Sequence, residues 1–548
     1  MEIQTIKKLE KQALKKSGTD FTRLGFALFF MIGVLTFSFL SNGGISNNMF
    51  LAIAALIGAY MAMNIGANDV ANNVGPAVGS KALTLTTAII IAAIFEAAGA
   101  LIAGGEVVKT IKKGIIDVAA FGGNADPFIW AMMAALLAAA LWLNFATMMR
   151  APVSTTHSIV GGVMGAGIAA AGFSIISWTT MAKIAASWVI SPVLGGIIAA
   201  LFLFAIKKSI VFKEDKVQAA KTYVPIFVAI MSLAFVTYLT IKGLSKIWPK
   251  VIEILNMLPL VTMQMSQKPS FTTALTLGLI VAVVVYFFVK HRVSSNTTTL
   301  ENTKASVNTL FTIPLIFAAA LLSFAHGAND VANAIGPLAA INNAVVNGGI
   351  SSDTSIPLWV MAVGALGIAL GLALYGPKLI KTVGSEITDL DQIRAFSIAM
   401  AASITVIIAS QLGLPVSSTH IAIGGVFGVG FLREWLHLTE SKRTIEDDRQ
   451  AIIDDKLNLH AYNAELKRLE EKDAKGQEDY ERIVELYKFI ADEEKHIKSA
   501  KKSIKKTKKV EYVKREAIKK IVTAWVVTVP AAAVLAGLLF FMIKGIML

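Results

Sequence analysis

Long apolar stretches, separated by short polar segments, run along most of the chain. A helix needs about 17–25 largely apolar residues to cross the hydrocarbon core of a bilayer. Such stretches predict membrane helices at 24–40, 48–66, 84–104, 128–148, 153–172, 178–205, 222–243, 271–289, 309–326, 356–376, 396–413, 415–432 and 521–545. The pattern therefore predicts an all-α polytopic membrane protein with about 12–13 membrane segments.

Two polar motifs interrupt this apolar pattern, and each occurs twice. The first reads GANDVANNVGPA at 66–77 and GANDVANAIGPL at 327–338, and the second reads PVSTTHS at 152–158 and PVSSTHI at 415–421. Copies in the same order and at similar spacing indicate a duplicated unit. The glycines and prolines of the first motif predict a helix broken there. Broken backbone is tolerated at membrane depth only where it lines a protein cavity.

Basic residues indicate how the repeats cross the membrane. Lys and Arg collect at 1–23, 206–222, 290–292, 378–394 and after 433. The positive-inside rule places these segments in the cytoplasm, so helices 48–66 and 309–326 cross in opposite directions. One region with Lys109, Lys112 and Lys113 falls on the opposite side. We predict inverted-topology repeats with broken helices and helical hairpins, and a site near the midplane. Whether 153–172 and 415–432 cross fully or re-enter stays open.

Composition narrows the class of protein further. The chain is 55% hydrophobic and 16% charged, with a net charge of +14 and no cysteine, and its mean hydropathy is +0.64. Basic residues beside membrane segments explain the charge without nucleic acid. No phosphate-cradling GxxxxGK[ST] loop is present to support ATP-driven transport. We expect a multi-pass protein of the cell (inner) membrane, with an uncleaved first helix and no cofactor.

The first motif places carboxylates in apolar surroundings. An Asp at the bilayer centre costs about 2.5–3.5 kcal/mol on insertion scales, so Asp69 and Asp330 need a functional reason. Carboxylate and amide oxygens suit a small hard cation. We predict a cation site, for Na⁺ or H⁺, at Asn68, Asn72, Asn329, Asn333, Asp69, Asp330 and Glu96.

The second motif offers hydroxyl groups at a helix N-terminus. Free backbone N–H groups and hydroxyls together favour oxyanions. Phosphate retains a P–OH that can donate to a carboxylate, whereas sulfate has no such proton. We predict a phosphate site at Asp69, Asp330, Ser154, Thr155, Thr156, Ser417, Ser418 and Thr419.

Other interpretations of these residues stay open at this point. Taken alone, the hydroxyl triplets favour ordinary helix capping over a binding role. His157 and His420 are typical of cap or core partners. Two alternative functions are a sulfate permease on the same scaffold and an intramembrane aspartyl protease, in which the two Asp residues would form an acid–base dyad. The protease needs neither the hydroxyl triplets nor the duplication, so we expect a transporter and not an enzyme.

The doubled motifs, with FEAAGALIAGGEVVKTIKKGIID at 95–117, closely resemble the inorganic phosphate transporter (PiT) family. The resemblance covers about 48–205, 309–432 and the last helix. It implies secondary phosphate uptake driven by Na⁺ or H⁺, with Asp69, Asn68, Asp330, Asn329 and both hydroxyl triplets at the phosphate and cation sites. It also implies that helix 24–40 is an extra N-terminal element. Residues 95–117 are more similar to sodium-coupled members.

Residues 433–520 are rich in charge, with apolar residues at helical spacing on either side of Gly476. They predict an antiparallel helical hairpin in the cytoplasm, with a role in regulation or homodimer formation, or as a solvated spacer. The basic segment Lys495–Lys520 favours anionic lipids.

The predicted division is 1–47 with the extra helix, 48–205 and 309–432 as transport repeats, 206–308 as linking helices, 433–520 as the hairpin and 521–548 as the final helix.

Overall fold

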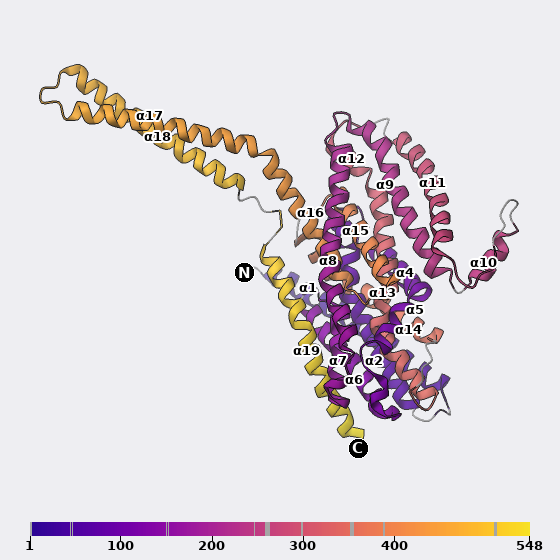
Figure 1. The fold of residues 1–548 in the computed structure, drawn as a ribbon. Coiled ribbons are helices and arrows are strands. Elements are labelled where there is room, and N and C mark those ends of the chain that lie inside the picture. Colours follow the sequence, from indigo (N-terminus) through magenta and orange to yellow (C-terminus); the bar gives the residue numbers. More distant parts are fainter. Residues whose placement is uncertain are drawn as a thin grey trace. The chain divides into compact units, whose positions relative to one another are not determined.

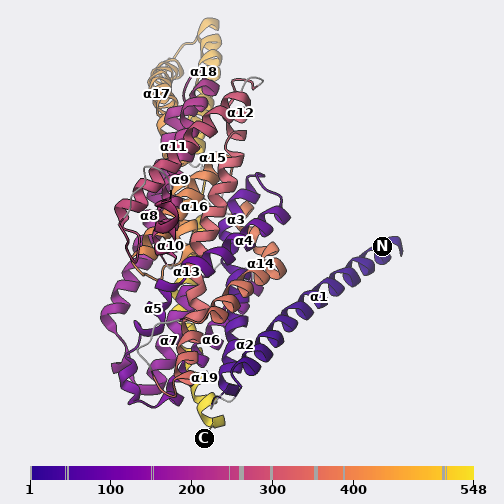
Figure 2. The same ribbon diagram turned by 90° about the vertical axis from the view of Figure 1, so that its right-hand side faces the viewer.

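The computed structural model describes residues 3–43, 45, 48–149, 151, 153–245, 247–257, 264–296, 300–350, 356–386, 389–508, 512–513 and 515–547. These residues form helices and no strands (Figures 1 and 2). The α-helices are α1 Ile3–Ser41, α2 Asn48–Asn68, α3 Val70–Gly79, α4 Leu85–Ala103, α5 Gly105–Lys113, α6 Ala125–Met148, α7 Thr155–Ala171, α8 Trp178–Ile206, α9 Lys216–Tyr238, α10 Trp248–Leu255, α11 Phe271–Asn296, α12 Lys304–Thr309, α13 Thr312–Val346, α14 Leu358–Glu386, α15 Gln392–Gln411, α16 Ser418–Glu440, α17 Lys442–Glu470, α18 Gln477–Lys508 and α19 Arg515–Met547. Short 3₁₀ turns lie at Val118–Phe121 and Phe173–Ile175, and π-helical turns extend α8 and α9 at Lys207–Val211 and Leu239–Gly243.

Twelve helical spans among the described residues are long and apolar enough to cross a membrane. They match the predicted polytopic architecture. The predicted segment 153–172 corresponds to α7, which has 17 residues and is not among the twelve. Membrane helices of this kind hold all their backbone hydrogen bonds internally, which the bilayer core requires.

The two copies of the GANDVAN motif differ in helix continuity. In the first copy α2 ends at Asn68 and α3 begins at Val70. Asp69 lies between them but keeps right-handed helical dihedrals, φ −83° and ψ −39°. The second copy lies within α13, which runs for 35 residues without a break. The predicted break at Asp330 is therefore wrong.

Packing explains why the motif glycines do not break α13. A Cβ added at Gly327 would overlap the carbonyl oxygen of Glu96 on α4, and one at Gly66 would overlap that of Ile368 on α14. Small residues let membrane helices approach this closely. The low helix propensity of glycine is overridden by this contact. Pro337 stays inside α13, as prolines do in membrane helices whose neighbours satisfy the freed backbone groups.

The same contacts interlock the two halves. Gly66 and Met63 of α2 face Ile368 and Gly371 of α14, so these helices run antiparallel. In the same way Gly327 and Phe324 of α13 face Glu96 and Gly99 of α4. Each motif helix thus packs against the helix that follows the motif in the other half. This exchange relates the two halves symmetrically, and it makes Glu96 and Ile368 equivalent positions.

The PVS(S/T)TH helices repeat the exchange. Gly165 of α7 lies against Ala533 of α19, and Gly428 of α16 lies against Gly196 of α8. The central helix α13 contacts α2, α4, α6, α14 and α15. Across this core, Gly58 of α2 faces Leu338 of α13. Asp69, which follows Gly58 in the sequence, lies close to Asp330, which precedes Leu338. The two motif copies therefore run in opposite directions.

Two peripheral pairs flank the interlocked helices. The extra helix α1 packs antiparallel to α14. The end of α1 meets the start of α14, where the ring centroids of Phe37 and Trp359 lie 6.3 Å apart. Towards the other ends of the two helices, Arg23 and Lys378 line one cavity. α1 also contacts α2, and α9 contacts α11 (Figure 2). α1 thus extends through the basic N-terminal segment that precedes the predicted helix 24–40.

Residues Gly430–Lys514 form a separate compact unit. Within it, α17 and α18 lie side by side as an antiparallel hairpin (Figure 1). Asn458 donates to Glu493 and Tyr487 donates to Glu470 across the pair. Arg482 bonds Glu465 at 2.9 Å, which holds the pKa of that carboxyl below its usual value. The cytoplasmic location, lipid contact and role of this unit remain predictions, and residues 509–511 and 514 lie outside the described residues.

Candidate functional site

The two Asp residues meet beside the hydroxyl groups of the second motif. Thr155 Oγ1 donates to Asp69 Oδ2 at 2.6 Å and lies 3.4 Å from Asp330 Oδ2. Ser418 Oγ donates to Asp330 Oδ2 at 3.1 Å. All four side chains are buried. The middle hydroxyl of each triplet therefore bonds the Asp of its own half.

The third hydroxyl of each triplet is contacted from the opposite half. Asn72 Nδ2 donates to Thr419 Oγ1 at 2.9 Å. Asn333 Nδ2 donates to Thr156 Oγ1 at 3.2 Å and to Thr155 Oγ1 at 3.0 Å. These crossed amide–hydroxyl bonds join the two halves at the site. They bring together residues that the sequence places far apart.

The first hydroxyl of each triplet caps its helix. Ser154 Oγ accepts from the backbone N–H of His157 at 3.0 Å, and Ser417 Oγ accepts from that of His420 at 3.2 Å. This is the capping geometry that the alternative interpretation of the triplets describes. Pro152, at the start of the first triplet motif, lies outside the described residues.

The two motif histidines occupy the core beside these caps. Their ring centroids lie 4.4 Å apart, and each ring also packs on a tryptophan, His157 on Trp188 and His420 on Trp525. Both histidines are buried. Their contacts are those of core partners.

Asn68 and Asn329 hold the chain that enters each triplet. Asn68 donates to Thr147 Oγ1 at 2.9 Å and accepts from the backbone N–H of Val153 at 3.2 Å. The amide oxygen of Asn329 accepts from Ser410 Oγ at 3.1 Å. In the same orientation its amide nitrogen donates to Asp330 Oδ1 at 3.0 Å. Thr147 and Ser410 are equivalent positions that the sequence pattern did not single out.

One half of the site carries an additional polar chain. His326 Nδ1 lies 2.8 Å from Glu96 Oε2, and its Nε2 lies 3.1 Å from Asp330 Oδ2. Asn73 Nδ2 donates to Glu96 Oε1 at 2.7 Å. All of these side chains are buried. A buried carboxylate needs such partners because isolated charge at membrane depth is costly.

Sequence reasoning identified Glu96 but missed His326 and Asn73. The signal for His326 was its spacing, because residues four apart on a helix share a face and Asp330 follows it by four. A second signal was the difference between copies, since Ile65 precedes Gly66 where His326 precedes Gly327. The position equivalent to Glu96 in the second repeat is Ile368, which faces Gly66 as Glu96 faces Gly327.

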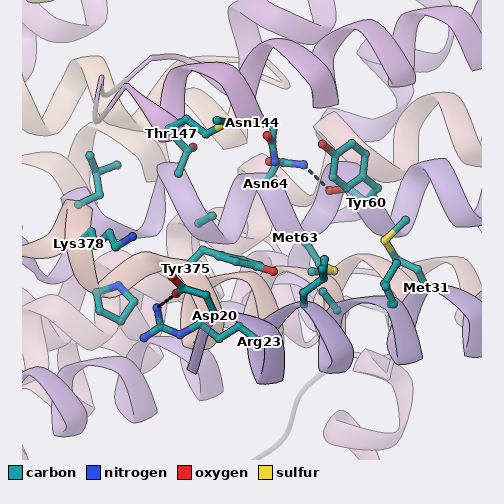
Figure 3. A pocket seen from close by; sticks show the side chains of 17 residues that line it. Asp20, Arg23, Met31, Tyr60, Met63, Asn64, Asn144, Thr147, Tyr375 and Lys378 are labelled. Carbon is teal, nitrogen blue, oxygen red and sulfur yellow. Dashed lines mark hydrogen bonds and ion pairs between the residues drawn. The ribbon is translucent and has the colours of Figure 1, made fainter. Parts of the chain in front are cut away.

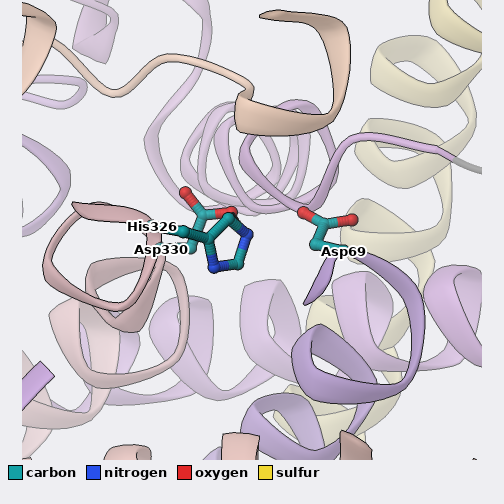
Figure 4. A group of neighbouring side chains, drawn as sticks. All are labelled: Asp69, His326 and Asp330. Carbon is teal, nitrogen blue, oxygen red and sulfur yellow. Dashed lines mark ion pairs between the residues drawn. The ribbon is translucent and has the colours of Figure 1, made fainter. Parts of the chain in front are cut away.

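The same cluster has the donor set for a cation. Asp69, His326 and Asp330 each offer a ligand atom within 4.8 Å of the others (Figure 4). Three buried oxygens of the first half, Asp69 Oδ1, Asn72 Oδ1 and Asn73 Oδ1, have no hydrogen-bond partner. Buried polar atoms are normally satisfied, and carboxylate and amide oxygens are ligands for hard cations. The residues present therefore fit a cation beside the carboxylates.

Comparison with known proteins supplies the family. The profile of the "Phosphate transporter family" matches residues 65–536. The chain belongs to the phosphate transporter family. Two bacterial relatives in this family are each named "Putative phosphate permease". The one from Helicobacter pylori strain J99 is 51% identical over 98% of both chains, and the one from Haemophilus influenzae is 38% identical over 70% of this chain and 87% of its own.

A solved structure has the same architecture. It is described as "The sodium-dependent phosphate transporter", and it matches with a TM-score of 0.69 and 29% identity over 90% of this chain and 99% of its own. This phosphate transporter family chain is therefore a multi-pass membrane protein of a transporter class, as the doubled motifs predict. The family is one of phosphate permeases and not of proteases or sulfate permeases, so it supports phosphate transport over both alternatives.

Proposed function

We propose that this protein imports inorganic phosphate together with Na⁺ by alternating access between its two inverted halves. The observation that carries the proposal is the meeting of Asp69 and Asp330, from antiparallel copies of one motif, with hydroxyls from both copies of the other. Inverted-repeat transporters hold their substrate at such an interface.

Phosphate is assigned to the two carboxylates and to the hydroxyl groups that both triplets present beside them. Thr155, Thr156, Ser418 and Thr419 present groups that can donate to the oxyanion, with Ser154 and Ser417 fixing the helix N-termini behind them. A P–OH of phosphate donates to Asp69 or Asp330. Hydrogen bonds with an ionised partner are roughly twice as strong as neutral ones.

Na⁺ is assigned to the carboxylate and amide oxygens next to phosphate. Its ligands are drawn from Asp69, Asp330, Asn68, Asn72, Asn329, Asn333 and Glu96. The partnerless oxygens Asp69 Oδ1 and Asn72 Oδ1 support this assignment. So does the name of the similar solved structure. A cation here offsets repulsion between the carboxylates and the phosphate oxygens, which couples the two ligands.

H⁺ is the second candidate for the coupling ion. The position of His326 favours it, because its Nδ1 bonds Glu96 Oε2, its Nε2 lies 3.1 Å from Asp330 Oδ2, and the imidazole is a side chain that takes up a proton near neutral pH. A proton on this ring would supply the charge that Na⁺ otherwise brings.

Radiolabelled phosphate uptake into proteoliposomes tests the proposal. We expect uptake when Na⁺ is imposed outside, little uptake when K⁺ replaces it at the same pH, and no competition from excess sulfate. Uptake driven by an inward H⁺ gradient in nominally Na⁺-free buffer would transfer the coupling role to the proton. Absence of uptake under both gradients, in vesicles shown to contain folded protein, would contradict the proposed function.

A further inference from the structure

A cavity of about 650 Å³ lies between α1, α2, α6 and α14, on the Asp69 flank of the site (Figure 3). Polar and charged side chains line it alongside apolar ones. Those that matter here are Arg23, Asn64, Asn144, Thr147, Tyr375 and Lys378. Arg23 comes from α1, which lies outside the region that the family profile matches.

Only one layer of side chains separates this cavity from the site. Thr147 lines the cavity, and its Oγ1 accepts from Asn68 Nδ2 at 2.9 Å. Asn68 directly precedes Asp69, and Ala67 also lines the cavity.

The opposite flank is filled at the equivalent positions. Alignment of the repeats pairs Met63 with Phe324, Asn144 with Ile407 and Tyr375 with Ala103. All three equivalents belong to one apolar cluster, closed by residues of α9. Phe235 and Tyr238 pack edge-on against Phe324, with ring centroids 5.6 Å and 6.2 Å away. The site is therefore hollow on one flank and packed on the other, which is the asymmetry that alternating access requires.

Two cations, Arg23 and Lys378, line the hollow flank together with the carboxylate of Asp20. Arg23 Nη1 and Asp20 Oδ1 form an ion pair at 3.6 Å, which is longer than a hydrogen bond, so the guanidinium keeps donors for a further acceptor. Lys378 comes from α14 across the cavity. Arg23 lies near the start of the α1 span Asp20–Ser41, and Lys378 near the end of the α14 span Leu358–Lys381. The positive-inside rule places both ends in the cytoplasm.

We propose that this cavity is the cytoplasmic vestibule of the phosphate pathway, where Arg23 of the additional helix α1 and Lys378 of α14 bind the oxyanion between the site and the cytoplasm. The inference rests on the proposed function. Basic groups in a low-dielectric cleft concentrate an anion and speed its passage. The Asn68–Thr147 layer is then the inner barrier of this vestibule.

The natural absence of cysteine allows a direct test. Asn144→Cys places a thiol in the cavity, and Ile407→Cys places one at the packed equivalent. With the purified full-length protein, we expect a negatively charged methanethiosulfonate to modify N144C at least about tenfold faster than I407C. We also expect the negatively charged reagent to modify N144C faster than a positively charged reagent of similar size does. Inorganic phosphate should slow this modification. Adding Arg23→Gln and Lys378→Gln should abolish the preference for the anion.

Transport measured from each side completes the test. In everted vesicles, the Arg23→Gln/Lys378→Gln variant should raise the KM for phosphate about five- to tenfold, while right-side-out vesicles keep the wild-type KM. Lys290→Gln, a basic residue outside the cavity, is the matched control and should change neither value. Equal reactivity of the two cysteines, or equal KM changes on both sides, would overturn the vestibule. Failure of the wild type to transport phosphate would instead remove the proposed function, and the charge selectivity at N144C would still decide whether the cavity is an anion vestibule.

Discussion

The Asp69 half and the Asp330 half of the site are built from one motif but differ at three buried positions. Each half pairs its Asp with the middle hydroxyl of its own triplet and contacts the third hydroxyl of the other half through an Asn. Only the Asp330 side of the site has the chain Asn73–Glu96–His326, in which Asn73 and Glu96 come from the first repeat and His326 from the second. At the equivalent positions the Asp69 side has Ala334, Ile368 and Ile65.

This difference suggests how two ligands share one site. The duplicated groups are hydroxyls, amides and carboxylates arranged about a pseudo-two-fold relation, which suits a compact oxyanion held from both sides. The groups present once form an acidic, hydrogen-bonded chain, which suits an ion that binds on one side. We infer that the duplicated part serves phosphate and shares its carboxylate and amide oxygens with Na⁺, whereas the single part sets the ion dependence.

Neutralising either Asp should give the largest effect. We expect Asp69→Asn and Asp330→Asn each to lower the initial rate of phosphate uptake at least about a hundredfold, because removing one partner from a buried charged group costs about 3–5 kcal/mol. Uptake into proteoliposomes at matched protein density measures this. Asp391→Asn is the control, since Asp391 caps α15 away from the site and Asn is an equally good cap. A variant at Asp69 that keeps near-normal uptake would break the symmetry between the halves.

Glu96→Gln should separate the ion from phosphate. The amide keeps the size of the side chain but removes the charge beside His326, so we expect the Na⁺ concentration for half-maximal uptake to rise about tenfold or more. Phosphate affinity at saturating Na⁺ should change less than threefold. Uptake measured over a Na⁺ series at fixed phosphate, and the reverse, distinguishes the two. Equal changes in both affinities would mean that Glu96 is not part of a separate ion system.

The converse substitution tests the same difference from the other half. Ile368→Glu alone buries a carboxylate at the position equivalent to Glu96 without an equivalent of His326, and we expect a loss of folded protein, measured by size-exclusion chromatography in detergent. Ile65→His with Ile368→Glu and Ala334→Asn rebuilds the chain in the Asp69 half. Folded protein in the triple variant but not in Ile368→Glu would support the Asn–Glu–His chain as a self-contained unit. A normal yield of folded protein from Ile368→Glu alone would contradict it.

These residues also show what the sequence could and could not predict. The duplicated motifs and the basic loops were sufficient to predict the inverted fold, because the copies indicate a duplication and the positive-inside rule gives the copies opposite directions. They could not predict the exchange of helices between halves, which depends on glycine contacts such as Gly66 with Ile368. The break expected at Asp330 was wrong for the same reason, since glycine propensity is local and helix packing is not. The partnership of His326 with Glu96 joins residues on α13 and α4, and no local pattern encodes it.

The crossed amides should have a smaller effect than either charge. Asn333→Ala removes donors to both Thr155 and Thr156, whereas Asn72→Ala removes the donor to Thr419. A neutral hydrogen bond contributes about 0.5–1.5 kcal/mol, so we expect phosphate affinity to fall about tenfold for Asn333→Ala and about threefold for Asn72→Ala. Isothermal titration of the purified protein with phosphate measures both. A larger loss for Asn72→Ala would reverse the order of the two halves.

The caps should give the smallest and most equal effects. Ser154→Ala and Ser417→Ala each remove a cap acceptor, which lowers stability by about 0.5–2 kcal/mol, so both variants should show a similar modest decrease in Tm. Phosphate affinity should stay within about twofold of the wild type, because both hydroxyl oxygens accept backbone N–H bonds. The comparison variants are Thr155→Ala and Ser418→Ala, whose hydroxyls contact the carboxylates and whose loss should weaken phosphate binding by about tenfold. If Ser154→Ala weakened binding as strongly as Thr155→Ala, the first hydroxyl would be a ligand as well as a cap. The first and middle hydroxyls of a triplet would then no longer have separate roles, and the two halves would no longer be equivalent in how they hold phosphate.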